Sequence, residues 1–157
     1  MLRRIRRPTL GNARGLTLIE LIIAITIIGL LAGAAVPIVR VRVKREKELE
    51  LRRDLWEMRD AIDRYKDAAD RNAFQTKVDS LGYPPDLQTL VDGVDVQGKK
   101  LRFLRRIPVD PMTGDTEWGK RSMQDEPTSD SWGGQNVFDV YSKTMDRDGN
   151  GKPYSEW

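Results

Sequence analysis

The feature that most constrains this chain is a long apolar run near its N-terminus. Residues 16–39 are almost wholly apolar, and the 19 residues from Leu21 to Val39 carry no charge. A helix rises about 1.5 Å per residue, so a run of this length roughly matches the hydrocarbon thickness of a bilayer. The 118 residues that follow have too little apolar material to surround such a helix on all sides. The run therefore predicts a transmembrane helix rather than a buried core helix.

The basic residues around this run do not settle its orientation. Five Arg occupy the 15 residues that precede it. Five basic residues also follow it closely, between Arg40 and Lys47. Because the excess of Lys and Arg usually marks the cytoplasmic side, the two counts nearly cancel.

The composition excludes several classes of active site. The 157 residues include no Cys and no His. The sequence therefore cannot form disulfides, thiol nucleophiles, imidazole bases or zinc sites made of Cys and His. We predict that the protein is not an enzyme, and any bound metal would need oxygen ligands.

The helix is expected to continue well beyond the membrane. Apolar residues recur at alternating spacings of four and three and form one stripe: Leu51, Leu55, Met58, Ile62, Tyr65 and Ala69. Neither Pro nor Gly occurs between Val39 and Gly82. We therefore predict one helix from near Leu16 to about Asn72, with its stripe docked on a core. Pro37 would bend it, because Pro removes one backbone hydrogen bond.

Oppositely charged residues four apart occupy the other faces of this helix. Glu48 and Arg52 form one such pair, and Asp60 and Arg64 form another. We expect both to be ion pairs on the helix surface.

The rest of the chain predicts a small α+β unit. Asp86 can cap a short helix that ends at Gly93. Residues 97–106 are basic and fit a loop or a short helix. The best strand is VFDVY at 137–141, and further strands are expected to contain Trp118 and to surround Tyr154. The expected fold is a long bent N-terminal helix, transmembrane in its first half, packed on a small antiparallel sheet.

The most specific motif is the junction Gly15-Leu16-Thr17-Leu18-Ile19-Glu20. An Arg-bearing leader ends in Gly, the apolar run begins at once, and one carboxylate lies at its fifth residue. A lone acid in a membrane segment costs about 2.5 to 3.5 kcal/mol on insertion scales, so Glu20 is expected to serve a partner. Alternatively, Glu20 lies close enough to the headgroups to be hydrated, or it pairs with the N-terminus of its own helix.

This junction resembles the start of the prepilins of type IV pili and of the pseudopilins of type II secretion systems. Their hallmark is a short basic leader that ends in Gly, followed by T-L-I-E-L and an apolar span with a Pro some twenty residues on. Gly15, residues 17–21 and Pro37 match this pattern. The chain departs from it only at Leu16, where Phe is commoner.

The resemblance implies a function for each part of the junction. A membrane prepilin peptidase would cleave between Gly15 and Leu16 on the cytoplasmic side and methylate the new amine of Leu16. Glu20 would pair with the charged N-terminus of a neighbouring subunit, and Thr17 and Pro37 would belong to the same assembly segment. The leader would then lie in the cytoplasm and the polar domain in the periplasm.

A second cleavage pattern competes with this one. Ala32-Gly33-Ala34 follows an apolar run and has the A-x-A form that an ordinary signal peptidase cleaves. Cleavage there would release a soluble protein that begins at Ala35. The acid at Glu20 and the better match at Gly15 favour the prepilin pattern.

Two further observations favour the secretion branch of the superfamily. Type IVa pilins typically close their C-terminal loop with a disulfide, which this chain cannot form, whereas major pseudopilins hold that region with calcium. Residues 104–119 and 137–157 also resemble the pattern of major pseudopilins. The resemblance therefore implies a structural subunit of a periplasmic pseudopilus that drives type II secretion across the outer membrane. The alternative is a type IV pilin for adhesion, motility or DNA uptake.

The implied organisation has three parts. Residues 1–15 would be the leader, 16–39 the transmembrane and assembly helix, and 40–157 the periplasmic domain, with an amphipathic helix at 40–72 and loops with a small sheet at 73–157. The implied partners are further copies in a filament, the prepilin peptidase, and the secretion or pilus assembly platform with minor pseudopilins. Before assembly, a single pass would anchor the subunit in the inner membrane. No nucleic-acid partner is expected.

Residues 146–151 (DRDGNG) fit either a calcium loop or a hairpin turn. Asp146, Asp148 and Asn150 place oxygens at alternate positions, and Gly stands at the sixth, as in the first half of an EF-hand. Trp157 replaces the bidentate Glu at the twelfth position, so Ser142 or main-chain carbonyls would have to complete the shell. The alternative is a turn, because Asp-Gly and Asn-Gly favour type I′ geometry.

A basic cluster surrounds Phe103 and contains Lys99, Lys100, Arg102, Arg105 and Arg106. Such a cluster can bind nucleic acid. We expect it instead to face acidic surfaces of neighbouring subunits, such as those that carry Asp125, Glu126 and Asp130.

Overall fold

The computed structural model describes residues 15–157, except for the side chains of residues 34–38. The predicted leader, apart from Gly15, and the side chain of Pro37 therefore lie outside the described residues. The chain divides into two compact units, Met1–Arg42 and Val43–Trp157.

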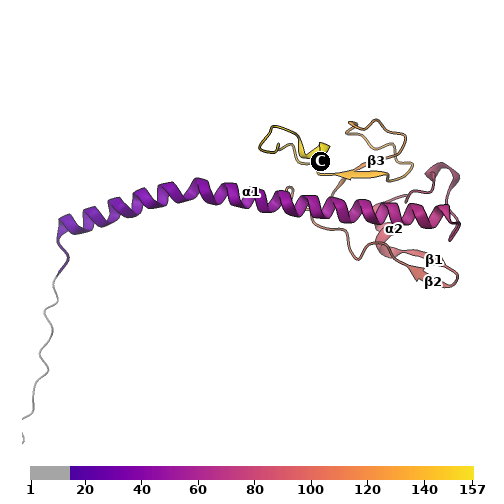
Figure 1. Ribbon diagram of the computed structural model, residues 1–157, viewed down its shortest axis with the longest axis horizontal. Helices are drawn as coiled ribbons and strands as arrows, with labels where there is room; N and C mark the ends of the chain where they lie inside the picture. The colour runs from indigo at the N-terminus through magenta and orange to yellow at the C-terminus, as the bar shows by residue number, and fades with distance from the viewer. Residues whose placement is uncertain (1–14) are drawn as a thin grey trace, which may run out of the picture. The chain divides into compact units, whose positions relative to one another are not determined.

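One long helix, α1, begins in the first unit and ends in the second. It spans Leu18–Asp70, so the helix predicted from near Leu16 to about Asn72 is confirmed (Figure 1). The helix ends because Asn72 adopts a left-handed backbone conformation with φ 55°. The Ala73 N–H then donates to Ala68 O at 3.1 Å and the Asn72 N–H to Ala69 O at 2.9 Å, which satisfies two of the last carbonyls.

The membrane span predicted at residues 16–39 stays a prediction. In the described part of the chain, no helix combines the length and the apolar character that a membrane crossing needs.

The core of the second unit forms on the predicted stripe of α1. All six stripe residues are at most 8% exposed. Five of them, all but Ala69, pack in one cluster with side chains from the rest of the unit: Leu87, Leu90, Phe103, Leu104, Trp118, Val137, Val140 and Tyr154. Burying a large apolar side chain stabilises a fold by about 1.5–3 kcal/mol, so this stripe is the main anchor of the unit.

The short helix expected after Asp86 is confirmed. Helix α2 spans Leu87–Asp92, and the Thr89 N–H donates to the Asp86 carboxylate at 2.7 Å. Gly93 ends the helix with φ 77°. A Cβ at this position would lie 2.5 Å from Leu101 O, so only Gly fits.

A hairpin follows α2, and it corrects the prediction of a loop or short helix at 97–106. Strand β1, Val94–Val96, pairs antiparallel with β2, Lys99–Leu101, with Val94 opposite Leu101. The turn residues Gln97 and Gly98 both have positive φ, 50° and 80°. Two such residues match the twist of the flanking strands, which favours the hairpin over a helix.

The second sheet is made of β3, Gly119–Arg121, and β4, Asp139–Tyr141, which pair antiparallel. The strand predicted at 137–141 is confirmed in its last three residues, and the one expected at Trp118 begins one residue later. The strand expected around Tyr154 is wrong, because Tyr154–Glu156 forms a 3-10 helix, η2, that buries Tyr154. Another 3-10 helix, η1, spans Val78–Ser80.

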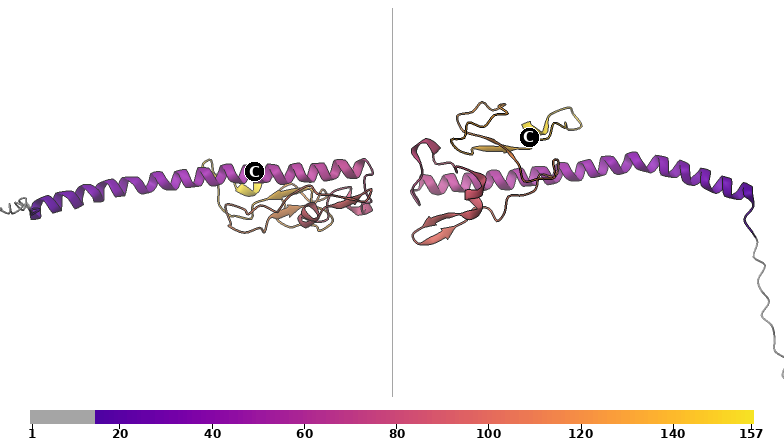
Figure 2. Two further views of the ribbon diagram at one scale, coloured as in Figure 1. Left: turned by 90° about the horizontal axis from the view of Figure 1, so that it is seen from below. Right: turned by 180° about the vertical axis from the view of Figure 1, so that it is seen from behind.

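The single predicted sheet is thus two separate two-stranded sheets. In Figure 1 the pair β1 and β2 lies below the C-terminal part of α1 and β3 lies above it, while the left view of Figure 2 shows both sheets on the same face of the helix.

Candidate functional site

The predicted processing junction lies immediately before the first turn of α1. The Glu20 N–H donates to Thr17 Oγ1 at 3.3 Å, and the Leu21 N–H donates to Thr17 O at 3.1 Å. Thr17 is therefore the N-cap of the helix, and Glu20 stands three residues later, as in a capping box. The resemblance assigns Thr17 only to the assembly segment. Its T-x-x-E spacing with Glu20 also indicates the helix cap that the structure shows.

Glu20 lies exposed in the first turn of α1, and it makes no ion pair within residues 15–157. The free N–H groups of a first helical turn favour a negative charge there. The Glu20 side chain is therefore accessible at the start of the helix.

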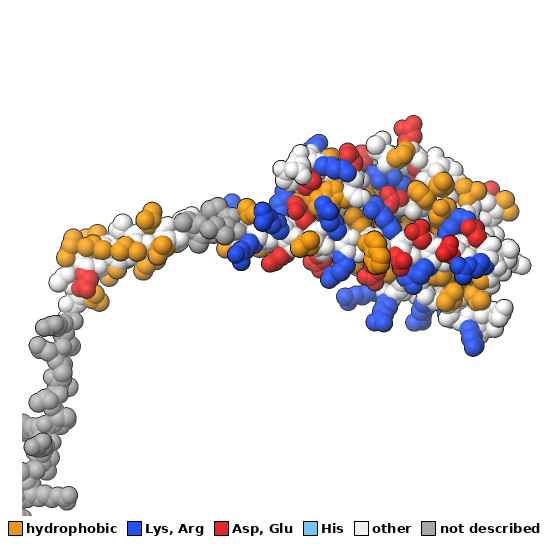
Figure 3. Space-filling model, in the orientation of Figure 1, with side chains coloured by type: hydrophobic (Ala, Val, Ile, Leu, Met, Phe, Trp, Pro, Cys, Tyr) orange, Lys and Arg blue, Asp and Glu red, His pale blue; other side chains and the backbone are white. Residues whose placement is uncertain are grey.

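The surface around Glu20 is apolar on all sides of the helix. Every large apolar side chain from Leu16 to Leu31 is at least 46% exposed. Figure 3 shows hydrophobic side chains covering this part of α1, with acidic atoms near its start. A contiguous exposed apolar surface of this kind marks an interaction site for an apolar partner.

The loop at 146–151 is closed by its own backbone. Asp148 Oδ1 accepts the N–H groups of Asn150 at 2.8 Å and Lys152 at 2.9 Å. The hydrogen bond from Lys152 is the main reason why the pKa of Asp148 lies below its usual range. Arg147 also donates to Gly151 O at 2.9 Å. These bonds shape the loop, while the side chains of Asp146 and Asn150 stay exposed, and the choice between a calcium loop and a hairpin turn stays a prediction.

Ser142 belongs to a different polar site. Its hydroxyl is buried and donates to Asp110 Oδ2 at 2.6 Å. Asp110 is fully buried as well, and its other oxygen accepts the Met112 N–H at 2.8 Å. This pair fastens the turn at 107–114, so Ser142 does not fit as a ligand of the loop at 146–151. Across residues 15–157, no three acidic side chains are grouped as a metal site would require.

Sequence reasoning missed a contact site where the last residues of the chain meet α1. Tyr154 is fully buried, and its hydroxyl donates to Glu48 Oε1 at 2.7 Å. Burial, and then the Glu48 carboxylate, raise the pKa of Tyr154. The Arg52 guanidinium lies 4.2 Å from the centre of the Trp157 ring. The predicted pair of Glu48 and Arg52 is wrong, because each side chain has a partner in the C-terminal segment.

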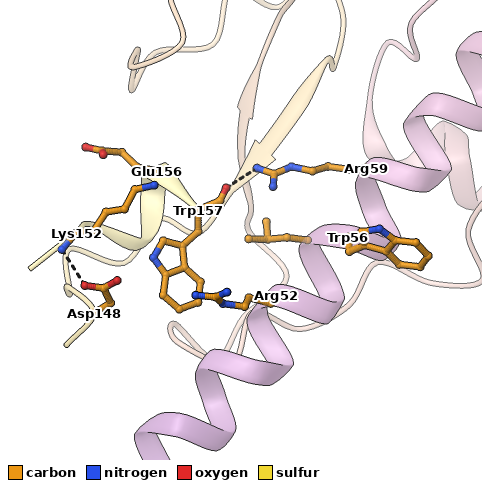
Figure 4. A pocket seen from close by; sticks show the side chains of 8 residues that line it. Arg52, Trp56, Arg59, Asp148, Lys152, Glu156 and Trp157 are labelled. Carbon is orange, nitrogen blue, oxygen red and sulfur yellow. Dashed lines mark hydrogen bonds between the residues drawn. The ribbon is translucent and has the colours of Figure 1, made fainter. Parts of the chain in front are cut away.

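Arg59 completes this contact site. It donates to Trp157 O at 2.9 Å (Figure 4), and it forms a 2.7 Å ion pair with Asp139 of β4. A cavity of about 490 Å³ remains beside these residues, and the indole of Trp56, 70% exposed, lies at its edge. The other predicted pair, Asp60 with Arg64, is confirmed at 2.9 Å.

Comparisons with known proteins give one family model and one relative. The family model described as the prokaryotic N-terminal methylation motif matches residues 10–36. The chain is also 30% identical over 105 residues to the type II secretion system core protein G of Escherichia coli (strain K12). This match covers 65% of the chain and 68% of that protein. No solved structure gives a significant match.

Proposed function

Because the chain belongs to the family of type II secretion system core protein G, the pseudopilins, we propose that it is a structural subunit of a periplasmic pseudopilus. One observation carries this proposal above the others. Helix α1 begins at Leu18 behind its cap Thr17, presents Glu20 in its first turn, and exposes an apolar surface that other molecules would have to cover. Such a helix end suits assembly and offers no catalytic group besides the one carboxylate.

The proposed sequence of events begins in the inner membrane. Residues 16–39 cross the membrane once, with the domain in the periplasm. The prepilin peptidase cleaves between Gly15 and Leu16 and methylates the amine of Leu16. The span then moves into a filament core of like helices, so its apolar surface stays covered. Glu20 gains the positively charged N-terminus of a neighbour, which a carboxylate in low dielectric needs.

The assembly machinery supplies what this chain lacks. The sequence has no phosphate-binding glycine loop, so extraction from the membrane would draw its energy from a separate cytoplasmic ATPase. The subunit would therefore contact the assembly platform and minor pseudopilins as well as its own copies.

Mass spectrometry of the mature N-terminus tests the processing step. We expect a chain that begins with N-methylated Leu16. Gly15→Val should leave an uncut precursor, because the side chain blocks the residue before the cleaved bond. Gly11→Val, in the same leader, is the matched control and should be cut normally. A mature chain that begins at Ala35 would refute the proposal.

A deletion strain separates the two candidate systems. Loss of protein secretion, with twitching and transformation retained, is expected for a pseudopilin. The opposite result would assign the subunit to a type IV pilus.

We also propose that the loop at 146–151 binds calcium through oxygens of Asp146, Asp148 and Asn150, with main-chain carbonyls in place of Ser142. The side chains of Asp146 and Asn150 are exposed and form no ion pair within residues 15–157, which leaves their oxygens available. Asp148 Oδ1 already accepts two main-chain N–H groups, so this side chain would bind through Oδ2. Calorimetry on the detergent-solubilised chain should show heat on addition of Ca²⁺ and a raised melting temperature. Neither effect is expected in Asp146→Asn/Asp148→Asn, and their absence in the native chain would remove the calcium site.

A further inference from the structure

We propose that successive copies of this chain contact one another through a basic ridge on one flank of the domain and an acidic loop on the other. The basic ridge is Lys99, Lys100, Arg102, Arg105 and Arg106, and the acidic loop is residues 122–132, which contain Asp125, Glu126 and Asp130. The inference rests on the proposed filament and specifies which surfaces meet within it.

The basic ridge is a dense and unpaired patch of positive charge. Five of the eight residues at 99–106 are basic and none is acidic. All five basic side chains are exposed, and none forms an ion pair within residues 15–157. Figure 3 shows Lys and Arg side chains projecting from the edge of the domain where Figure 1 places β1 and β2.

The backbone under the basic ridge is held firmly. Phe103 and Leu104 are buried, and their N–H groups both donate to Leu90 O at 3.0 Å. Arg64 of α1 donates to Phe103 O at 2.9 Å, and the Phe103 ring packs edge to face on Tyr65 with centroids 5.2 Å apart. The charges are thus presented on a fixed surface, which lowers the entropy lost when a partner binds.

The acidic loop has the opposite charge and is also ordered. Residues 122–132 contain three acidic residues and no basic one. Asp125 closes the loop, because its carboxylate accepts the N–H groups of Ser122 at 2.7 Å and Gly133 at 3.0 Å. These bonds, first that from Ser122, hold the pKa of Asp125 below its usual range. The Tyr141 hydroxyl donates to Asp130 O at 3.2 Å.

The carboxylates of Glu126 and Asp130 are the ones left for a partner. Both side chains are exposed and neither forms an ion pair in the described part of the chain. Several acids of α1 differ in this respect. Asp60, Asp67 and Asp70 each pair with a basic residue four positions away, Arg64, Arg71 and Lys66.

The two patches lie on opposite flanks of the same unit. The basic ridge extends from β2, whereas the acidic loop leaves β3 and returns to β4. Both sheets cover the same face of α1 (Figure 2), but Figure 1 shows β2 at the lower edge of the unit and β3 at its upper edge. Different patches that complement each other form a heterologous contact, and such a contact repeats from copy to copy in an open array. A patch that bound an outside ligand would need no complement on the far flank.

Cysteine cross-linking tests which surfaces meet, and the Cys-free chain makes the experiment clean. In assembled filaments of the full chain, Arg105→Cys/Glu126→Cys should give an oxidised ladder of dimers and larger species. The matched control is Arg105→Cys/Glu117→Cys, since Glu117 is exposed and acidic but pairs with Lys143 in another loop. This control and both single variants should give no ladder. Two results would overturn the inference. One is a ladder from Arg105→Cys/Asp63→Cys, with Asp63 on α1, but not from Arg105→Cys/Glu126→Cys. The other is no ladder from Arg105→Cys/Glu126→Cys in filaments that form normally.

Charge reversal provides an independent test. Arg105→Glu/Arg106→Glu should lower the yield of sedimentable filaments by more than about tenfold, because like charges then face each other. Adding Glu126→Arg/Asp130→Arg to the same chain should restore the yield, and salt should weaken both effects. Failure of this rescue in chains that melt like the native protein would count against the contact.

Two measurements separate this inference from the proposed function. If native chains with a methylated Leu16 form filaments but lack the cross-link, only the inference fails; if they form no filaments, the proposed function fails first. Binding of labelled duplex DNA that the reversal abolishes, with filament yield unchanged, would instead assign the basic ridge to nucleic acid.

Discussion

The two halves of α1 use apolar residues in opposite ways. From Leu16 to Leu31 the apolar side chains surround the helix, and each large one is at least 46% exposed. From Leu51 to Ala69 the six stripe residues are each at most 8% exposed, and Trp56 is the large apolar side chain that lies outside the stripe. The first half leaves its apolar surface for something outside the chain, whereas the second half satisfies its own within the domain.

This difference teaches that apolar content alone does not say what a helix packs against. The distribution of apolar side chains around the helix does indicate its packing partner, because one layer of protein can cover a stripe but cannot cover a surface that is apolar on all sides. The polar residues agree with this division. Glu20 has no ionic partner within residues 15–157, whereas Glu48 binds Tyr154 and Asp60 binds Arg64.

The largest effect is expected from the removal of Glu20, the one acid in the first half of α1. Glu20→Ala should leave cleavage and methylation intact but abolish filaments, because the cationic N-terminus of a neighbour loses its partner. Mass spectrometry reports the processing, and sedimentation with electron microscopy reports the filaments. The melting temperature of the domain should not change.

Glu46→Ala is the matched control for this prediction. Glu46 is an exposed acid on the same helix, but it lies in the second unit. Its variant should assemble normally. If Glu20→Ala forms normal filaments, Glu20 has no role in assembly. If it unfolds the domain, the two halves of α1 are not independent.

The second prediction concerns the stripe. Met58 is fully buried, so Met58→Ala should lower the free energy of unfolding by about 2–5 kcal/mol through lost contacts and a cavity. Leu49→Ala, at a side chain that is 69% exposed, should change it by less than about 0.5 kcal/mol. Chemical denaturation in detergent measures both. Equal effects of the two substitutions would mean that the stripe is not what anchors the domain.

How much of the fold could be predicted follows from the range of the interactions involved. The extent of α1, its stripe and the Asp86 cap depend on local spacing, and all three were predicted correctly. The hairpin of β1 and β2 was missed because its turn, Gln97-Gly98, lacks the Asn or Asp that usually marks a type I′ turn. Tyr154 was assigned to a strand because its aromatic side chain fits one as well as it fits a core.

The candidate sites likewise divide into those formed by neighbouring residues and those formed by residues far apart in the sequence. The junction at Gly15 could be found from sequence, since its residues are consecutive. The partner of Ser142 could not, because Asp110 lies 32 positions away and only the folded chain brings the two together. The same reason explains the error at Glu48, whose true partner Tyr154 lies 106 positions away.

The smallest effect is expected where the two halves of α1 meet. Glu48 is among the first residues of the helix to bind the rest of the domain, through the buried hydroxyl of Tyr154. Tyr154→Phe should lower the free energy of unfolding at neutral pH by about 1.5 kcal/mol, the usual value for a hydrogen bond to a charged group. Tyr83→Phe is the control, since the Tyr83 hydroxyl makes no hydrogen bond to any described residue and its ring contact with Phe138 would remain.

The pH dependence of Tyr154→Phe gives this prediction its sharpest form. Burial and Glu48 raise the pKa of Tyr154 above the ordinary value of 10.0, so above pH 10 the unfolded chain loses this proton before the folded one does. Stability from this group is therefore complete below pH 10 and falls as the pH rises beyond it. The difference between the native chain and Tyr154→Phe should shrink between pH 10 and about 11.5. A constant gap for Tyr154→Phe would mean that the hydroxyl is not buried against Glu48, and that the second half of α1 begins to be covered only further along the helix, at Leu51.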